Sequence, residues 1–213
     1  GLQSADTDLT SQSRLTRELQ QQLMRVRLVP FANVSERLYR VARQTAKELD
    51  KRVNVDVRGG NTEIDRGVLE KMAGPFEHLI RNAIVHGLET PGERRAAGKP
   101  ETGELVVDVK PEGNEIVVVV SDDGAGLDRQ RIRERAIERD LITPDQEVGD
   151  RELMELIFQP GFTTVTEVTE LAGRGVGMDV VRAELASFGG RIAIASEQGR
   201  GTRFTLYLPM TLA

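Results

Sequence analysis

Apolar residues recur at helical spacings near the start of the chain. One set is spaced by four, four and three residues and predicts an amphipathic helix that ends before Pro30: Leu15, Leu19, Leu23 and Val26. A second set predicts another helix: Val34, Leu38, Val41, Thr45 and Leu49. Residues 1–13 are polar, and we expect them to be loose. The first helix either pairs with a second copy of the chain or packs back on the main domain.

The next apolar residues alternate with polar ones and predict β-structure. A strand is predicted through Val53, Val55 and Val57, with residues 62–64 as its short partner after a glycine turn. Asp65 can cap a following helix. We expect that helix to break at Gly74-Pro75.

Two hairpins follow, at residues 105–120 and 191–208. The run 116–120, IVVVV, has no polar alternation and predicts a central strand. Helical patterns occupy about 128–139 and 150–158, and a further one passes through Val180 and Leu185 and stops at Gly189-Gly190. By composition, residues 88–102 and 159–173 are loops.

The stretch His78–Gly87, HLIRNAIVHG, separates into two faces when it is placed on a helix. Its apolar face should pack on a sheet: Phe76, Leu79, Ile80, Ala83 and Ile84. His78, Asn82 and His86 recur every four residues and form a polar ridge on the other side. A solvated helix face usually carries Lys and Glu, so two imidazoles beside an amide indicate a ligand site as the alternative to a solvated polar face.

The composition argues against several classes of function. The chain has 213 residues, 38% of them hydrophobic, with a net charge of −5, two histidines and no cysteine. A general nucleic-acid binder, a disulfide framework and a zinc site are therefore not expected. We find no membrane-spanning run or signal peptide, so we expect a cytoplasmic location without membrane insertion. The chain begins with Gly1, and we interpret it as part of a longer protein.

Three glycine-containing segments could contact a ligand, although each has a simpler interpretation. Asp122-x-Gly124-x-Gly126 follows the central strand, where a carboxylate could accept a hydrogen bond from the amine of adenine. Gly173-Arg174-Gly175-Val176-Gly177 precedes a helix and could bind phosphates, or it is a flexible hinge. Gly199-Arg200-Gly201-Thr202 by itself is a hairpin turn. Asn82 offers an uncharged oxygen ligand for Mg²⁺.

Together, five segments resemble the boxes of the ATP-binding fold shared by sensor histidine kinases, gyrase, Hsp90 and MutL, the Bergerat-type fold. They are HLIRNAIVHG, DDGAG, IFQPGFTT, GRGVGMDVV and GRGT. Longer strings narrow the resemblance to the chemotaxis histidine kinases and their relatives that control twitching pili: TEIDR, HLIRNAIVHGLETPGER, GRGVGMDVVR and RVRLVPF. The resemblance covers about residues 15–213.

This resemblance implies a role for each matching residue. Asp122 would bind the adenine amine with the support of Thr202, and Gly124 and Gly126 would shape the pocket. Asn82 would ligate Mg²⁺, while His78 takes the position where many relatives have a glutamate base. The remaining positions would contact phosphate or form the lid over the nucleotide: His86, Arg131, Phe158, Gly173, Gly175 and Gly177.

The residues themselves favour a kinase over a hydrolase. A gyrase-type enzyme deprotonates water with a carboxylate at position 78, where this chain has histidine. Val85 departs from the family pattern, because chemotaxis kinases commonly have an acidic residue there. Both histidines belong to the nucleotide-facing ridge, so neither is expected to be the phosphorylated one.

We therefore expect an α+β, two-layer α/β sandwich with helices over one face of a mixed sheet, preceded by a helical segment. Residues 1–30 would be a disordered start and the remnant of a dimerisation helix, and residues 31–213 the ATP-binding kinase domain. The expected function is Mg²⁺-dependent transfer of the γ-phosphoryl group of ATP to a histidine on an upstream phosphoacceptor domain, which then supplies a response regulator. An ATP-hydrolysing conformational switch and a weakly binding dimer scaffold are the alternatives.

Overall fold

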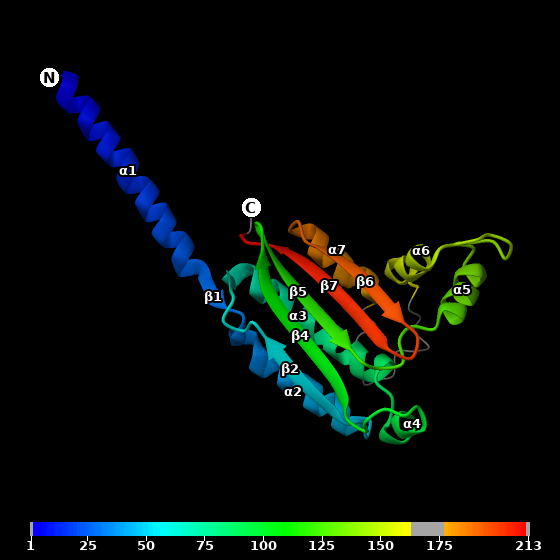
Figure 1. The fold of residues 1–213 in the computed structure, drawn as a ribbon. Coiled ribbons are helices and arrows are strands. Elements are labelled where there is room, and N and C mark those ends of the chain that lie inside the picture. The colour runs from blue at the N-terminus through cyan, green and yellow to red at the C-terminus, as the bar shows by residue number, and fades with distance from the viewer. Residues whose placement is uncertain (1, 163–176, 212–213) are drawn as a thin grey trace.

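A five-stranded sheet forms one layer of the protein, in the order β2-β4-β5-β7-β6. A computed structural model describes residues 2–162 and 177–211 (Figure 1). The strands are β2 (Val53–Arg58), β4 (Gly103–Glu112), β5 (Glu115–Asp122), β6 (Arg191–Glu197) and β7 (Gly201–Pro209). β2 runs parallel to β4 and the other neighbours are antiparallel, so the sheet is mixed as expected. β5 is the central strand, which confirms the interpretation of IVVVV.

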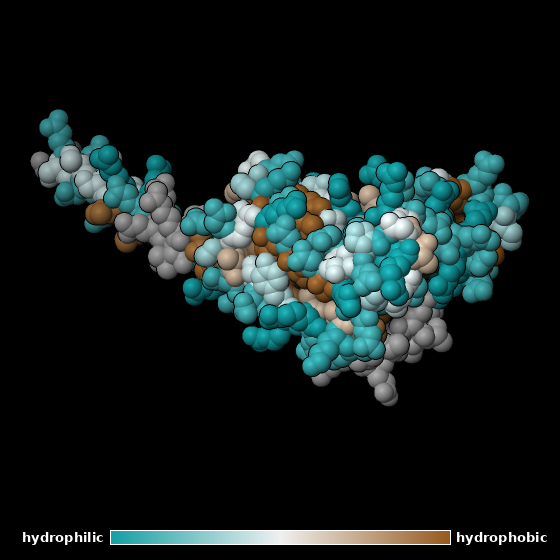
Figure 2. All heavy atoms as spheres, turned by 60° about the horizontal axis from the view of Figure 1, so that its bottom comes forward, coloured by the Kyte–Doolittle hydropathy of each residue, from teal (hydrophilic) through white to brown (hydrophobic). Residues whose placement is uncertain are grey.

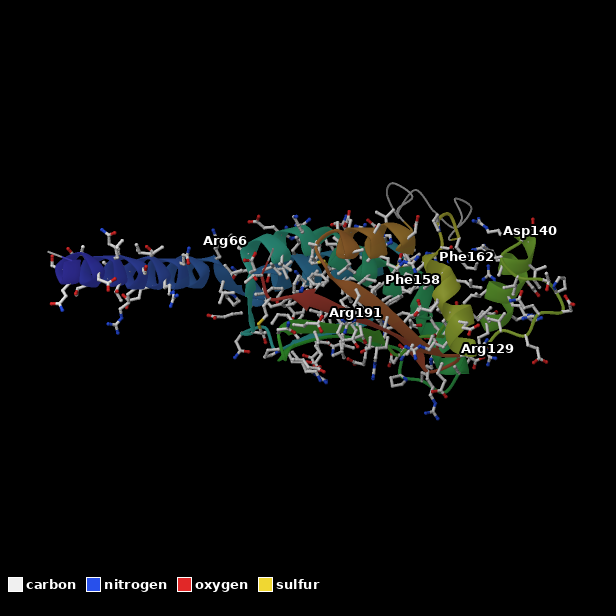
Figure 3. All side chains as sticks on the ribbon, turned by 90° about the horizontal axis from the view of Figure 1, so that it is seen from above. Arg66, Arg129, Asp140, Phe158, Phe162 and Arg191 are labelled. Atoms are coloured by element: carbon white, nitrogen blue, oxygen red, sulfur yellow. The ribbon has the colours of Figure 1, made fainter. Side chains whose placement is uncertain are left out.

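Helices form the second layer, on one face of the sheet (Figure 3). The helices are α1 (Leu2–Arg27), α2 (Ala32–Glu48), α3 (Arg66–Asn82), α4 (Pro91–Ala96), α5 (Arg129–Glu138), α6 (Asp150–Glu155) and α7 (Met178–Ser187). A π-helical turn, η1 (Ala83–Gly87), extends α3, and a 3-10 turn, η2 (Leu156–Phe158), extends α6. The two-layer α+β prediction is confirmed.

The core lies between the two layers. The predicted apolar face of the central helix is buried in full, since Phe76, Leu79, Ile80, Ala83 and Ile84 are each at most 9% exposed. Ile116, Val118 and Val120 of β5 are buried with them, and by alternation Val117 and Val119 lie on the other face of the sheet. Figure 2 shows a mostly polar surface with a strip of apolar residues along the middle of the body.

The start of the chain differs from the prediction. Residues 2–13 are helical, because α1 begins at Leu2 and projects away from the body (Figure 1). This segment contains no glycine or proline to interrupt a helix, and the hydroxyls of Thr7, Thr10 and Thr16 donate to carbonyls four residues earlier. Leu9, Leu15 and Leu19 are more than half exposed, so α1 does not pack back on the body. Among the described residues, no helix is long and apolar enough to cross a membrane.

Two local predictions between β2 and α3 are wrong. β3 (Glu63–Asp65) pairs with β1 (Leu28–Pro30) and not with β2, because hydrogen bonds from Phe31 and Ala32 to the carbonyls of Thr62 and Gly60 draw the chain toward β1. The helix does not break at Gly74-Pro75, and α3 runs through Pro75. Proline removes one backbone hydrogen bond, but the residues around it are buried on the core side, and their packing offsets that loss.

Asp65 links this region to the helix that carries the polar ridge. As predicted, it caps α3, accepting hydrogen bonds from the backbone N–H groups of Gly67 at 2.8 Å and Val68 at 3.2 Å. It is almost fully buried, and Arg27 forms an ion pair with it at 3.6 Å. The end of α1 and the start of α3 therefore meet at one carboxylate.

Replacement of Asp65 tests this cap. Asp65→Ala leaves two backbone N–H groups without an acceptor and should lower the free energy of unfolding by roughly 1–2 kcal/mol, measured by urea denaturation. Asp65→Asn keeps an oxygen acceptor and is the matched control, with a smaller expected loss. Equal losses in the two variants would mean that the charge, and not the cap, is the stabilising feature.

Candidate functional site

Asp122 lies at the end of β5, against the last residue of the π turn. A Cβ atom added at Gly87 would lie 3.1 Å from Oδ2 of Asp122, so this glycine and the carboxylate are in contact. The N–H of Gly124 donates to Asp122 Oδ1 at 2.9 Å, and the N–H of Ala125 donates to the carbonyl of Gly87 at 2.8 Å. The DDGAG loop and the end of HLIRNAIVHG therefore meet around one carboxylate.

Glycine is required where these backbones meet. A Cβ at Gly124 would lie 2.1 Å from the Gly87 carbonyl oxygen, and one at Gly201 would lie 1.9 Å from the Asp122 carbonyl oxygen. Gly126 has φ +73°, and a Cβ there would be 2.4 Å from the Glu197 carbonyl oxygen. The predicted glycines thus permit close backbone contact, and the GRGT segment joins the same site.

Thr202 lies next to Asp122, as predicted. Its side chain is buried, and its hydroxyl is 3.0 Å from the hydroxyl of Ser196. Ser196 also accepts from the N–H of Leu127 at 2.8 Å and so connects the β6–β7 hairpin with the chain that leaves the DDGAG loop. Sequence reasoning did not identify Ser196, because a lone serine on a strand carries no distinguishing pattern.

The Asp122 carboxylate is weakly acidic. Burial raises its pKa from 3.8 to about 6, and nearby Asp123 and Glu89 act in the same direction. Backbone hydrogen bonds from Gly124 and Thr202 lower the pKa and offset part of that shift. Near neutral pH the group is ionised and largely removed from water, so it is a strong acceptor for a ligand N–H group.

His78 and Asn82 form a pair on the helix that precedes the π turn. The Asn82 amide nitrogen is 3.2 Å from His78 Nε2 and 3.5 Å from the sulfur of Met178, the first residue of α7. An amide nitrogen only donates, so Nε2 accepts and a neutral ring carries its proton on Nδ1. Burial lowers the His78 pKa, and the charges of Arg81 and His86 add to this effect, which favours the neutral ring.

The helix that carries the polar ridge changes its hydrogen-bonding pattern after Asn82. α3 ends at Asn82, a π turn follows, and His86 within that turn is exposed, while its charge still acts on the His78 ring. Lys51 donates to the carbonyls of Ile84 at 2.7 Å and Val85 at 3.1 Å, where the change of hydrogen-bonding pattern leaves acceptors available. Burial lowers the pKa of Lys51, against the raising effect of Glu93 and Glu89. No pattern in the sequence predicted this role for the lysine.

The other predicted site residues that the structure describes belong to α5, η2 and the start of α7. Gly177 precedes the first residue of α7, beside the Met178 contact to Asn82. Phe158 is fully buried, with the Arg182 guanidinium 5.4 Å from its ring centre (Figure 3). Arg131 is exposed in the first turn of α5. Gly173 and Gly175 lie outside the described residues.

A charged cluster beside the site was missed. Residues 88–102 were predicted to be a surface loop, but they contain α4 and the fully buried Arg94. Arg94 donates to Glu89 at 2.9 Å and to the Asp123 carboxylate at 3.0 Å, while Lys99 donates to Glu89 at 2.7 Å. A stretch rich in Gly, Pro and charge looks solvated, and only tertiary contacts reveal that its arginine is buried.

The arrangement places its two kinds of polar group at opposite ends of one turn. Asn82 immediately precedes η1 and Gly87 ends it, and Gly87 contacts Asp122. A half-buried carboxylate at one end can accept a hydrogen bond from a nucleotide base, while an amide beside a neutral imidazole at the other can bind a metal ion or orient a reacting group.

The raised pKa of Asp122 makes folding stability depend on pH. Between about 4 and about 6 the folded state keeps the proton that the unfolded state releases, so this group's contribution to the free energy of unfolding should fall as pH rises through that window. Urea unfolding of the wild type and Asp122→Asn across pH 4–8 isolates the effect, because asparagine does not titrate. A difference between the two proteins that is independent of pH would refute the assignment.

Comparisons with known proteins agree with this geometry. A family model described as histidine kinase-, DNA gyrase B- and HSP90-like ATPase matches residues 70–212. The chain is similar to chemotaxis protein CheA of Rhizobium meliloti (strain 1021), with 43% identity over 213 residues that cover 100% of this chain and 28% of that protein. The corresponding protein of Bacillus subtilis (strain 168) is 42% identical over 203 residues, covering 94% of this chain and 30% of that protein. The chain thus spans less than a third of these relatives.

Solved structures support the fold independently. The catalytic domain of histidine kinase ThkA in a nucleotide-free form is similar with a TM-score of 0.54 and 17% sequence identity, over 86% of this chain and 95% of that chain. A second crystal form of the same domain gives a TM-score of 0.51. Since the family model covers most of the chain, the protein belongs to the family of histidine kinase-, DNA gyrase B- and HSP90-like ATPases.

Proposed function

We propose that this chain is the ATP-binding catalytic domain of a chemotaxis-type histidine kinase, and that it transfers the γ-phosphoryl group of ATP to a histidine of a separate phosphoacceptor domain. The observation that carries the proposal is the half-buried Asp122 carboxylate, enclosed by the backbones of Gly87, Gly124 and Thr202. The similarity to chemotaxis protein CheA over the whole chain supports the same conclusion.

In this proposal Asp122 accepts a hydrogen bond from the exocyclic amine of adenine. Its carboxylate is ionised near neutral pH, and its backbone partners Gly124 and Thr202 hold it in place. Thr202 stands beside the acid, and Gly124 and Gly126 give the planar base close access to the backbone. A pocket that pairs this amine would favour adenine over a base with an acceptor at that position.

Asn82 is the proposed Mg²⁺ ligand. Its amide nitrogen contacts His78 and Met178, and its carbonyl oxygen is the atom suited to a hard cation. Within residues 2–162 and 177–211 there is no group of three acidic or histidine side chains that could hold a metal. The single amide oxygen of Asn82 would suit a magnesium ion that takes its other ligands from phosphate and water. The ion would supply charge neutralisation.

His78 is the proposed group for handling the incoming nucleophile. Its lowered pKa keeps it neutral, so it can orient an acceptor histidine or remove a proton from it once Nε2 is released from Asn82. His86 and Arg131 are proposed to contact the phosphates, and Phe158 and the glycines 173, 175 and 177 to belong to the lid. A hydrolase would need a carboxylate to activate water, and histidine occupies that position here.

The partners follow from the same proposal. The relatives are more than three times as long as this chain, so a phosphoacceptor domain elsewhere in a longer protein is the proposed substrate, and a response regulator receives the phosphoryl group next. The exposed leucines of α1, Leu9, Leu15 and Leu19, suit pairing with a second copy of the chain.

The nucleotide pocket is tested by Asp122→Asn. The amide would present a donor or a neutral acceptor to adenine, so we expect the affinity for ATP with Mg²⁺ to fall by roughly ten- to a hundredfold in a calorimetric titration. Asp145→Asn changes an exposed aspartate in the loop that follows α5 and should bind as the wild type does. Unchanged affinity in Asp122→Asn would count against the pocket.

The role of His78 is tested by separating binding from transfer. His78→Ala should leave ATP affinity within about twofold of the wild type and lower the rate of phosphoryl transfer by roughly a hundredfold. His78→Gln keeps an acceptor for the Asn82 amide without a titratable ring, so recovery of transfer in this variant would assign orientation and not proton removal to His78.

The substrate is tested by labelling with radioactive ATP. The chain alone should acquire no acid-labile label, because both of its histidines are assigned to the nucleotide site. Addition of an isolated phosphoacceptor domain of a chemotaxis kinase should give acid-labile label on that domain. Strong self-labelling would contradict the proposal, and steady release of phosphate without acceptor would favour the hydrolase.

A further inference from the structure

A cluster of four charged side chains holds the loop that carries Asp122 in place, and one of them belongs to the loop itself: Glu89, Arg94, Lys99 and Asp123. Arg94 is fully buried and donates to Glu89 and Asp123 from the two ends of its guanidinium group, at 2.9 and 3.0 Å. It also donates to the Pro100 carbonyl at 2.6 Å and to the Asp123 carbonyl at 3.3 Å. The arginine thus ties α4 to the residue that follows Asp122.

Lys99 fastens the same loop one residue further along. Its ammonium group donates to the carbonyls of Asp123 at 3.0 Å and Gly124 at 2.9 Å and to Glu89 at 2.7 Å. Burial alone raises the Glu89 pKa, but the hydrogen bond from Lys99 and the charges of Lys99 and Arg94 hold it below its usual value. Glu89 is therefore the ionised centre on which both cations converge.

The sheet holds this loop from its other side. Asp123 exchanges backbone and side-chain hydrogen bonds with Glu104 of β4: its N–H donates to the Glu104 carbonyl at 3.2 Å, and its Oδ1 accepts from the Glu104 N–H at 2.9 Å. The two residues after Asp122 are therefore fixed by β4 and by two cations. Movement of the loop would separate the buried guanidinium from the Asp123 carboxylate and weaken the neutralisation of its charge, so the arrangement is stiff.

We propose that Arg94 and Lys99 are positioning residues that set the direction of the Asp122 carboxylate and so determine selectivity for adenine nucleotides. The proposal rests on the function proposed above. Asp122 itself is held by backbone N–H groups, one of them from Gly124, and a glycine-containing loop has little stiffness of its own. The cations at Asp123 and Gly124 supply that stiffness.

Selectivity for adenine over guanine depends on the direction in which the Asp122 carboxylate points more than on the total affinity for the nucleotide. A carboxylate aimed at the amine of adenine repels the carbonyl oxygen that guanine has at the same place, whereas a carboxylate free to turn away can avoid it. Loss of the hydrogen bonds that Arg94 and Lys99 donate to the loop should therefore weaken the binding of ATP more than the binding of GTP. A general loss of folded protein would reduce both in the same proportion.

Lys99→Met is the test variant, because it keeps the aliphatic stem and removes all three donated bonds. Arg94→Met would remove a fully buried guanidinium that pairs with both Glu89 and Asp123, and this variant is prone to unfold. We titrate each variant with ATP and with GTP in the presence of Mg²⁺ and compare the two dissociation constants. The ratio of the GTP to the ATP dissociation constant should fall about fivefold or more in Lys99→Met and be restored in Lys99→Arg. Lys110→Met, at the opposite end of β4 from Asp122, is the matched control and should keep the wild-type ratio.

Amide hydrogen exchange on the nucleotide-free chain tests the fastening without any ligand. Lys99→Met should lose protection at Gly124 and Ala125, while amides in the β6–β7 hairpin keep it. Unchanged exchange at these two amides, or equal loss of ATP and GTP binding, would overturn the proposal. If the wild type binds no ATP, the proposed function fails, and the exchange result still decides whether Lys99 fixes the loop.

Discussion

A largely buried carboxylate needs hydrogen-bond donors, and this requirement organises the structure around Asp122. Its donors are backbone N–H groups of Gly124 and Thr202, which belong to segments about eighty residues apart in sequence. The end of the helix that carries His78 and Asn82 must also reach the acid, and it does so at Gly87. Because three backbones meet at one side chain, the positions of closest approach have no room for a Cβ atom. The spacing of glycines in the sequence is the consequence of that crowding.

The parts that follow from local chemistry were predictable from the sequence. Helical periodicity predicted the buried face of the central helix, the unbroken apolar run IVVVV predicted a central strand, and the position of Asp65 before a helix predicted a cap. The proximity of Asp122, Gly124 and Thr202 was predicted from the order of the motifs along the chain, because each segment alone had a simpler interpretation. These residues lie at strand ends and glycine turns, which can be located in a sequence without knowledge of side-chain contacts.

The parts that depend on distant contacts were not predictable. Pro75 breaks a helix in isolation, yet here burial on both sides of it keeps α3 continuous. Residues 62–64 had an obvious partner in β2, but Leu28–Pro30 offered a second partner that no local pattern marks. Arg94 looked like one of many surface charges, and its burial depends on Glu89 and Asp123 together. In each case the deciding neighbour is remote or carries no periodic signal.

The two histidines lie in different surroundings. His78 is half-buried on α3, whereas His86 belongs to the π turn that follows Asn82 and is exposed. Lys51 supports the turn through the carbonyls of Ile84 and Val85. Val85 thus contacts this lysine through its backbone carbonyl, whatever side chain the position carries. His78 is half-buried and pairs with Asn82, and its lowered pKa favours the neutral ring, which is why the proposed function gives proton handling to His78 and phosphate contact to the exposed His86.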